Sequence, residues 1–468
     1  RGDGTSRSAR IVDALRVPHL LRVPSGVVVP PSFRLPGRGR HRLLDGGAGL
    51  HQHRRCDRHH ARDGTHASVH LLRWKFAHRI DGRRRTADER RPSTAMTVHA
   101  VVTGGGTSGH VLPALAVIEA LVDRGHPLDT LRYFGAQRGV ETRLVPPTGV
   151  AHTFFDVVGL QRSLDRLSDN LGFVPRLLAA RRRAIAMFEA DRPRVVVSVG
   201  GYASLPAVLA ARRLRIPIVV VSYDRRPGRS SGITARWAAA CAVAFPDSPL
   251  PRARHTGAPV RRDIRRLDRT VDRRASRQRL GVGSERFLVV AVGGSLGSAG
   301  LNAAVEKLVR ESASDSTLAV RHVVGERFLA DVTRRMNDII TSSGGVRYDV
   351  IGYEDAMRDV YAGCDLFVGR GGAGTIAEVA SVGVPSILVP WSGAADDHQT
   401  GNVRWLADRG AAIMVSDDDV VESLVDVVRA LRIDDSRREQ LASRAHDLGD
   451  LNRRGAIAEL IDEVARRD

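Results

Sequence analysis

The chain has 468 residues, which is enough for two or three domains of ordinary size. Its formal net charge is +20, but residues 1–95 hold 21 Arg and Lys against 8 Asp and Glu, so the excess does not support nucleic-acid binding by the whole chain. Three widely spaced cysteines without a CxxC pair indicate neither a disulfide framework nor a zinc site, and no apolar run approaches the ~18–20 residues of a membrane span.

Residues 1–95 differ in composition from the rest of the chain. They hold nine of the 17 histidines and basic clusters such as "HQHRRCDRHH", and no helical or strand period persists in them. We predict that this basic segment is a disordered extension, or that the natural protein begins near Met96 and lacks it. A metal site in the histidine cluster is the alternative, although the spacing matches no zinc pattern.

The first clear strand, loop and helix follow Met96. The apolar run "VHAVV" predicts a strand, and "TGGGTSGHVLPALA" comes directly after it. Apolar residues at i, i+4, i+7 and i+11 predict one helix face, made of Val111, Leu115, Ile118 and Val122. Two interpretations of the glycine loop stay open: a cradle for phosphate oxygens at a helix start, or a tight turn with no ligand.

Three more strand-to-glycine junctions occur later in the chain. "RFLVVAV" leads into "GGSLGSAG", and "VVVSVGGYASLP" and "LFVGRGGAGTIAEVA" have the same pattern. Apolar strands that alternate with helical periods are typical of a parallel α/β sheet, in which such loops lie at the carboxyl edge. We therefore predict an α/β protein with two Rossmann-like domains, residues 96–258 and 286–468 with terminal helices, joined by a basic linker at residues 259–285.

His110 lies at the start of the first predicted helix. A nicotinamide-binding loop would carry a third glycine or alanine there, and no acidic residue suited to a ribose follows ~20 residues later, so a dehydrogenase is disfavoured. Because imidazole titrates near neutrality, His110 is a candidate general base or substrate contact. The alternative is a residue that bonds only its own loop.

The motifs of residues 96–468, taken in order, resemble the MurG family of glycosyltransferases. The most specific are "GGGTSGHVLPALA", "GRGGAGTIAEVASVGVPSILVP" and "DDHQTGN", and "GAQRGVETRLVP", "GLQR", "SVGGYASLPA", "AFPDS", "TGAPVRRD" and "GGSLGSAGLN" agree with them. The resemblance implies the GT-B fold, with two Rossmann-like domains facing a cleft. It also implies inverting transfer of N-acetylglucosamine from UDP-N-acetylglucosamine to lipid I, giving lipid II for peptidoglycan, without a cofactor or a bound metal.

The resemblance also assigns roles by motif position. Glu378 would accept the ribose hydroxyls, Gln399 would bind the sugar and Arg261 would meet the diphosphate. His110 is the candidate catalytic residue, and the first glycine loop would receive the acceptor's diphosphate. The other donor-side candidates are Thr107, Ser108, Gly109, Gly294, Ser295, Ala373, Gly374, Thr375 and Asp397, and the acceptor-side candidates are Gly105, Gly106, Tyr202 and Asp224. For Glu378 the alternative is a solvated residue in the first turn of a helix.

A lipid acceptor implies a peripheral protein on the cytoplasmic face of the cell membrane, with no nucleic-acid partner. The segment that begins at "GLQR" offers leucines together with arginines, a pattern that suits anionic lipid. The arginines are Arg162, Arg166, Arg176 and Arg181–Arg183. A solvated helix face is the alternative.

The sequence departs from the family pattern mainly on the acceptor side. The family's "HEQN" stands here as "VSYD", so Ser222 replaces a glutamate and Asp224 an asparagine; Leu296 and Ala258 replace a glutamine and an asparagine elsewhere. Serine cannot act as a carboxylate base, whereas the donor motifs are mostly kept. Three alternatives therefore stay open: a transferase with another acceptor, a UDP-N-acetylglucosamine 2-epimerase of the same fold, and a non-catalytic UDP-sugar-binding protein.

Overall fold

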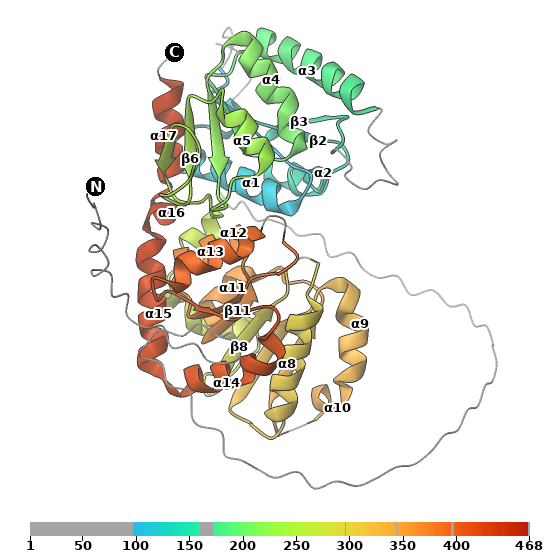
Figure 1. Cartoon of the computed structure of the whole chain (residues 1–468), viewed down its shortest axis with the longest axis vertical. Helices are drawn as coiled ribbons and strands as arrows, with labels where there is room; N and C mark the ends of the chain where they lie inside the picture. Colours follow the sequence, from blue (N-terminus) through green and yellow to red (C-terminus); the bar gives the residue numbers. More distant parts are fainter. Residues whose placement is uncertain (1–96, 160–171, 295, 343, 395–396, 467–468) are drawn as a thin grey trace, which may run out of the picture. The chain divides into compact units, whose positions relative to one another are not determined.

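The computed structural model describes the chain in five stretches, which form two compact units (Figure 1). The stretches are 97–159, 172–294, 296–342, 344–394 and 397–466. The predictions for residues 1–95, Arg162, Arg166 and Ser295 lie outside them. The N-terminal unit contains the described residues up to Ser222, residues 227–261 and the chain from Ala456, and the C-terminal unit contains Tyr223–Arg226 and Arg262–Gly455.

Seven parallel strands form the sheet of the N-terminal unit, in the order β3-β2-β1-β4-β5-β6-β7. They are β1 (Ala100–Gly104), β2 (Leu131–Ala136), β3 (Ala151–Phe155), β4 (Val195–Gly200), β5 (Ile218–Ser222), β6 (Ala240–Val243) and β7 (Ala253–His255). Every residue of β1, β4, β5 and β6 is buried. This burial explains why these strands read as continuous apolar runs rather than as alternating patterns.

The first helix, α1 (Ser108–Asp123), confirms the predicted helix behind the glycine loop. Val111 and Ile118 are buried as expected, but Leu115 and Val122 are only half-buried, and Leu121 is buried instead. The other helices of the unit are α2 (Glu141–Leu144), α3 (Phe173–Ala190), α4 (Leu205–Leu214), α5 (Arg229–Ala235) and α17 (Ala456–Ala465), with short 3-10 turns η1 (Leu128–Thr130), η2 (Pro146–Thr148) and η4 (Tyr202–Ser204).

Helix α17 differs from the prediction, which placed the terminal helices with the C-terminal domain. It contacts α1, β4 and β6 of the N-terminal unit and buries Ile457, Leu460, Ile461 and Val464. An apolar stripe of this kind must be covered by another element, and the sequence of the helix does not say which unit supplies the cover.

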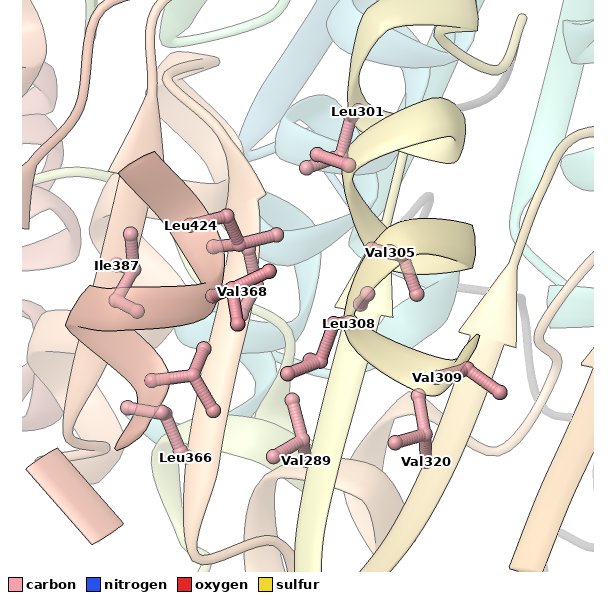
Figure 2. Packing of buried hydrophobic residues seen from close by; sticks show 14 of the residues in the cluster. Val289, Leu301, Val305, Leu308, Val309, Val320, Leu366, Val368, Ile387 and Leu424 are labelled. Atoms are coloured by element: carbon pink, nitrogen blue, oxygen red, sulfur yellow. The ribbon is translucent and has the colours of Figure 1, made fainter. Parts of the chain in front are cut away.

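Six parallel strands form the sheet of the C-terminal unit, in the order β10-β9-β8-β11-β12-β13. They are β8 (Phe287–Val292), β9 (Leu318–Val323), β10 (Arg347–Ile351), β11 (Leu366–Arg370), β12 (Ser386–Val389) and β13 (Ile413–Met414). Figure 2 shows the core on one face of this sheet, where α8 (Ala299–Glu311) and α14 (Val420–Ile433) pack against the strands. Leu301, Val305 and Leu308 of α8 share the face that the sequence predicted, and all three are buried.

The remaining helices of the C-terminal unit include two inside the predicted linker. They are α6 (Arg262–Arg265), α7 (Arg269–Arg279), α9 (Glu326–Arg335), α10 (Asn337–Ile340), α11 (Met357–Gly363), α12 (Ala373–Val382), α13 (His398–Ala407), α15 (Asp435–Leu448) and α16 (Asp450–Arg454). The linker prediction was wrong for α7, because its basic residues are used in packing: Arg277 is buried and binds Asp365, which also pairs with Arg273. Asp268 caps the helix by accepting from the Thr270 N–H at 2.8 Å.

The predicted α/β class with two Rossmann-like domains is confirmed. In each sheet the strand order reverses between two neighbouring parallel strands, β1 and β4 in one unit and β8 and β11 in the other. The connection after one of these strands runs toward one edge of the sheet, and the connection after the other runs toward the opposite edge. Ligands of open α/β sheets bind beyond the carboxyl ends of strands at such switch points. Within the described stretches, no helix has the length and apolar content needed to cross a bilayer.

Candidate active site

All four predicted glycine loops lie at the two switch points. In the N-terminal unit they follow β1 and β4, where Gly104 and Gly200 are paired across the strands. In the C-terminal unit they follow β8 and β11. The structure therefore brings the motifs together in pairs, one pair in each unit.

The two loops of the N-terminal unit pack directly on each other. A Cβ atom added to Gly201 would lie 2.4 Å from the carbonyl oxygen of Gly105, and one added to Gly106 would lie 2.7 Å from the Tyr202 ring. Gly106 and Gly201 also have φ values of 92° and 77°, which L side chains rarely adopt. Close loop packing is thus sufficient reason for glycine at these positions.

His110 lies between these two loops. Its Nδ1 is 3.1 Å from the Thr107 hydroxyl, so one ring nitrogen is oriented by its own loop. The other edge of the ring faces Gly200, whose added Cβ would lie 3.4 Å from both His110 Nε2 and Ser231 Oγ. Half-buried at the start of α1, His110 can present Nε2 at the switch point while Thr107 fixes its orientation.

Glu141 is a further residue of this loop pair that the sequence analysis did not select, although it lies in the quoted motif "GAQRGVETRLVP". Its side chain is fully buried in α2. The Gly106 N–H donates to both carboxylate oxygens at 3.2 and 3.1 Å, and the Ala136 N–H donates at 2.8 Å. Burial and the Glu141 charge both raise the pKa of Tyr133 and of Tyr202.

This carboxylate changes the interpretation of the first glycine loop. The Gly106 N–H is directed to Glu141, and the buried negative charge lies directly under the loop. A simple phosphate cradle requires backbone N–H groups that point at the anion, so this loop does not have that geometry at Gly106.

The first loop of the C-terminal unit is more open. Among the described residues nothing lies within 4 Å of a Cβ atom added to Gly294, where φ is 85°. Gly297 is different, because its added Cβ would lie 2.2 Å from the Val324 carbonyl oxygen. Ser298 caps α8 by accepting from the Leu301 N–H at 3.3 Å. The loop is therefore fixed at its end and leaves space at Gly294.

Arg370, at the end of β11, connects the loops of this unit. Its guanidinium donates to Ser298 Oγ and, at 2.6 Å, to Asp417 Oδ1. Asp417 Oδ2 accepts from the backbone N–H and the hydroxyl of Ser392 at 3.1 and 3.0 Å. Burial opposes ionisation of Asp417, but the bonds from Arg370 and Ser392 outweigh it and lower its pKa. The sequence does not reveal this network, because its members follow or end four different strands.

The second loop of the C-terminal unit leads into α12. Within the described stretches, a Cβ added to Gly372 or Gly374 would meet no atom within 4 Å, and Gly374 is exposed. Glu378, one turn further along α12, is half-buried and accepts from the Tyr361 hydroxyl at 2.9 Å. It is therefore oriented by the protein, unlike the freely solvated residue of the alternative interpretation.

Gln399 and Asp397 lie at the start of α13. The Gln399 side-chain oxygen accepts from the Trp391 N–H at 2.9 Å, so its amide nitrogen is the end directed to other partners. Asp397 has φ 51°, an uncommon backbone conformation for aspartate, and accepts from the Thr400 hydroxyl at 2.5 Å. The half-exposed Trp391 lies on the same connection.

The predicted donor and acceptor sets are divided between the two units in a way the sequence did not reveal. Asp224 belongs to Tyr223–Arg226, which groups with the C-terminal unit, whereas the other acceptor-side candidates are in the N-terminal unit. Its carboxylate accepts from the amide of the fully buried Asn402, whose oxygen accepts from the Arg225 N–H. In the donor set, Thr107, Ser108, Gly109 and Arg261 are in the N-terminal unit, and Gly294, Ala373, Gly374, Thr375, Glu378, Asp397 and Gln399 are in the C-terminal unit.

Comparison with known protein families places both units in one enzyme class. Residues 100–243 match the glycosyltransferase family 28 N-terminal domain, and residues 288–459 match the family 28 C-terminal domain. A protein of Paenarthrobacter aurescens named UDP-N-acetylglucosamine–N-acetylmuramyl-(pentapeptide) pyrophosphoryl-undecaprenol N-acetylglucosamine transferase is 36% identical over 381 residues. The alignment covers 81% of this chain and 99% of that protein.

Solved structures agree with this placement. MurG of Acinetobacter baumannii is 25% identical, with a TM-score of 0.61 over 78% of this chain and 99% of that one. The UDP-GlcNAc 2-epimerase of Neisseria meningitidis, solved with UDP-GlcNAc bound, is 14% identical, with a TM-score of 0.54 over 79% of this chain and 100% of that one. At that identity the epimerase shares the fold alone.

Proposed function

The chain belongs to the MurG family within glycosyltransferase family 28, and we propose that it catalyses the transfer named for its relatives. The donor is UDP-N-acetylglucosamine, and the acceptor is the undecaprenyl-diphosphate-linked muramyl pentapeptide, lipid I; the product is lipid II of peptidoglycan synthesis. The observation that carries this proposal is the 36% identity to a transferase of that name over 99% of its length.

The C-terminal unit is proposed to hold the donor. Among the described residues no atom lies within 4 Å of a Cβ added to Gly294, Gly372 or Gly374, and each glycine lies close to the start of a helix whose N-terminal dipole favours an anion. The UDP diphosphate would lie along these helix starts, beside Ala373 and Thr375. Arg370 does not need to touch the donor, because its bonds to Ser298 and Asp417 hold the loops in place.

The ribose and the sugar have proposed partners in the same unit. The Tyr361 hydroxyl orients Glu378, whose carboxylate is the proposed acceptor for the ribose hydroxyls. Gln399 has its oxygen engaged by Trp391, which directs its amide toward the hydroxyls of the sugar. Asp397 is the residue directly before α13.

The N-terminal unit is proposed to hold the acceptor and to supply the base. An acceptor hydroxyl attacks the anomeric carbon, a C–O bond forms, the bond to the UDP oxygen breaks, and the configuration inverts. His110 would take the hydroxyl proton on Nε2, in the tautomer whose Nδ1–H donates to the Thr107 hydroxyl. Tyr202 and the backbone at Gly105 and Gly106 would line the acceptor, and Arg261 would balance the charge that develops on the departing diphosphate.

Contact with an anionic membrane is a further part of the proposal. On α3, Val174 and Leu178 are 58% and 44% exposed, and Arg182 and Arg183 are exposed on the same helix. Exposed apolar residues beside arginines suit insertion at the surface of the cytoplasmic leaflet, where lipid I would be presented. This is the basis for proposing a peripheral location at the cell membrane.

The membrane contact is tested by sedimentation with phosphatidylglycerol and phosphatidylcholine vesicles. We expect binding to the anionic vesicles and its loss in the Val174→Ser, Leu178→Ser double variant. The matched control is Val271→Ser on α7, which removes an apolar side chain that is 74% exposed in the C-terminal unit. Equal binding by the α3 variant would remove this part of the proposal.

The reaction is tested by measuring UDP release with UDP-N-acetylglucosamine, with and without a short-chain lipid I analogue. Release that depends on the acceptor supports the transferase. One observation favours a transferase with another acceptor: Ser222 lies buried at the end of β5, where the family pattern has a carboxylate. If the donor binds but lipid I gives no UDP, the lipid I assignment is wrong, and a panel of other hydroxylated acceptors becomes the test.

A further inference from the structure

Three side chains with metal-ligating chemistry meet at the edge of the N-terminal sheet opposite the glycine loops. His99 directly precedes β1, His126 follows α1, and Asp462 is on α17 at the end of the chain. Because β1 spans five residues, His99 is separated from the loop after Gly104 by about 16 Å along the strand. The cluster is therefore separate from the proposed catalytic groups.

The ligand atoms of the three residues already lie close together. Asp462 Oδ1 is 3.1 Å from His99 Nε2 and 2.8 Å from His126 Nε2, and all three atoms lie within 4.8 Å of one another. Ligands of a tetrahedral Zn²⁺ with bonds of about 2.0–2.2 Å are separated by about 3.4 Å. The observed spacing therefore requires only small movements to enclose an ion.

The surroundings supply the support that metal sites use. Arg124 donates to the second carboxylate oxygen of Asp462 at 2.9 Å, which orients the carboxylate and leaves Oδ1 to the two rings. The side chains of His99 and Asp462 are each 13% exposed and that of His126 is 24% exposed, so the group is sheltered but reachable. A cavity of about 360 Å³, lined by all three residues, has room for a water as a fourth ligand.

We propose that His99, His126 and Asp462 form a binding site for a divalent transition metal of the Zn²⁺ class, completed by water from the cavity. Two imidazoles and one carboxylate with an open fourth position are an established donor set for this ion. The ion would join the last helix of the chain to the strand that opens the N-terminal unit. It would serve the stability of this unit and not the transfer reaction.

Binding has two structural requirements that the site can meet. Each ring must present an unprotonated Nε2, with its proton carried on Nδ1. The rings are stacked with centroids 3.7 Å apart at 15°, so they must also tilt apart to share one ion, and the cavity beside them leaves room for this. Arg194 and Arg466 also line the cavity and weaken the affinity for a cation.

The test uses the full chain, stripped of metal with a chelator and titrated with Zn²⁺ near pH 7.5 against a competing chromophoric chelator. Residues 1–95 carry nine further histidines, so the number of ions bound is judged by difference. We expect His126→Gln to bind one ion fewer than the unaltered chain. Glutamine can still donate a hydrogen bond to Asp462 but is a poor Zn²⁺ ligand. The variant therefore keeps the contact with α17 and loses only a metal ligand. The matched control is His152→Gln, which alters an exposed histidine of the same unit.

Thermal unfolding provides a second readout that does not depend on the count. Zn²⁺ at a hundredfold excess over its Kd is expected to raise the Tm of the unaltered chain and of the His152→Gln variant by roughly 5 °C, and to leave the His126→Gln variant unchanged. Asp462→Asn serves if the histidine variant does not fold. The same stoichiometry and the same Tm shift in the cluster variants would overturn the proposal and leave the three residues as a hydrogen-bonded clasp.

Discussion

The two Rossmann-like units share a strand order but use their switch-point glycines for different purposes. In the N-terminal unit, a Cβ atom at Gly105 or Gly106 would come within 2.3 or 2.7 Å of a neighbouring side chain. In the C-terminal unit, one at Gly372 or Gly374 would meet nothing within 4 Å among the residues described. Glycine at Gly105 and Gly106 permits close packing, as it does at Gly297 of the C-terminal unit, whereas at Gly372 and Gly374 it leaves space where a ligand can approach the backbone.

The charged side chains beneath the glycine loops also differ between the two units. Under the N-terminal loops lies the carboxylate of Glu141, held by backbone N–H groups, whereas the C-terminal loops are tied together by the guanidinium of Arg370. The Glu141 carboxylate disfavours a diphosphate in contact with Gly106, whereas the charge of Arg370 is balanced by Asp417 and opposes no anion at the C-terminal loops. Similar glycine motifs therefore do not indicate the same ligand, and the contrast supports donor binding by the C-terminal unit.

The largest effect is expected from a substitution of His110, which tests whether the N-terminal unit supplies catalysis and the C-terminal unit binds the donor. His110→Ala should lower kcat by ~10²–10⁴-fold, because a positioned base contributes about that much, while the Kd for UDP-N-acetylglucosamine stays the same. Steady-state kinetics and donor titration measure the two quantities. His152→Ala is the control within the same unit. A loss of donor affinity that matches the loss of rate would place the donor at His110 and contradict the proposed division of roles between the two units.

The next effect tests the cation of the C-terminal unit. Asp417→Ala leaves Arg370, with its side chain 11% exposed, without its main anionic partner, and such a change costs about 3–5 kcal/mol. We expect a lower unfolding midpoint in urea and a higher KM for the donor, with the KM for the acceptor unchanged. The double variant Arg370→Met, Asp417→Leu should recover much of the stability but not the donor KM, because the loops lose their common tie.

The corresponding change in the N-terminal unit is Glu141→Gln. The amide nitrogen of glutamine would face a backbone donor at Gly106 or Ala136, and a buried donor left unpaired costs about 1–3 kcal/mol. We expect the acceptor KM to rise and the donor Kd to stay constant, as measured by turnover and by titration. If the donor Kd changes instead, Glu141 supports the nucleotide site and the two units are less distinct than proposed.

How far the sequence predicted these features depends on whether they are local. Apolar runs and helical spacing correctly indicated parallel strands, the helix behind "TGGGTSGH" and the α8 face, because each depends on residues near in the chain. The network of Arg370, Ser298 and Asp417 joins segments far apart in the sequence, and the cover for α17 comes from α1, β4 and β6, which lie much earlier in the chain. Neither periodicity nor motif spacing predicts such contacts, because they form only when the sheet brings distant segments together.

A smaller, pH-dependent effect is expected in the C-terminal unit. Burial lowers the pKa of His322 to about 3; the Tyr348 hydroxyl lies 2.8 Å from its Nδ1 and the Asn302 oxygen 3.1 Å from its Nε2. Below the unfolded pKa of about 6.5 the unfolded chain takes up a proton that the folded chain refuses, so stability falls as pH falls from about 6.5 toward 3. The loss at pH 5 is about 2 kcal/mol.

Urea unfolding at pH 7 and pH 5 measures this loss, and UDP binding, which we propose for the C-terminal unit, provides a second readout of that unit. His322→Gln should be less stable than the unaltered chain at pH 7 but should lose less stability between the two values. His152→Gln should follow the unaltered chain at both. If all three proteins lose the same free energy of unfolding between pH 7 and pH 5, a group other than His322 is responsible for the acid sensitivity.

The smallest effect compares the two helix starts directly. Gly109 and Gly374 are both exposed glycines in the first turn of a helix, and an added Cβ meets nothing closer than 3.6 Å at Gly109 and no described atom within 4 Å at Gly374. Alanine at either position should stabilise its helix by at most about 1 kcal/mol, because glycine is the poorer helix former. A gain in stability therefore separates any kinetic change from damage to the fold.

Only one of these alanines should affect the donor. If the UDP diphosphate approaches the backbone of α12, the added methyl group of Gly374→Ala displaces it and raises the donor KM by about fivefold, the equivalent of one hydrogen bond of ~1 kcal/mol. Gly109→Ala should leave the donor KM unchanged, although the family resemblance also placed Gly109 on the donor side. A rise in the donor KM for both variants would mean that the starts of α1 and α12 both approach the nucleotide, and the open glycines of the C-terminal unit would then no longer be the feature that selects it.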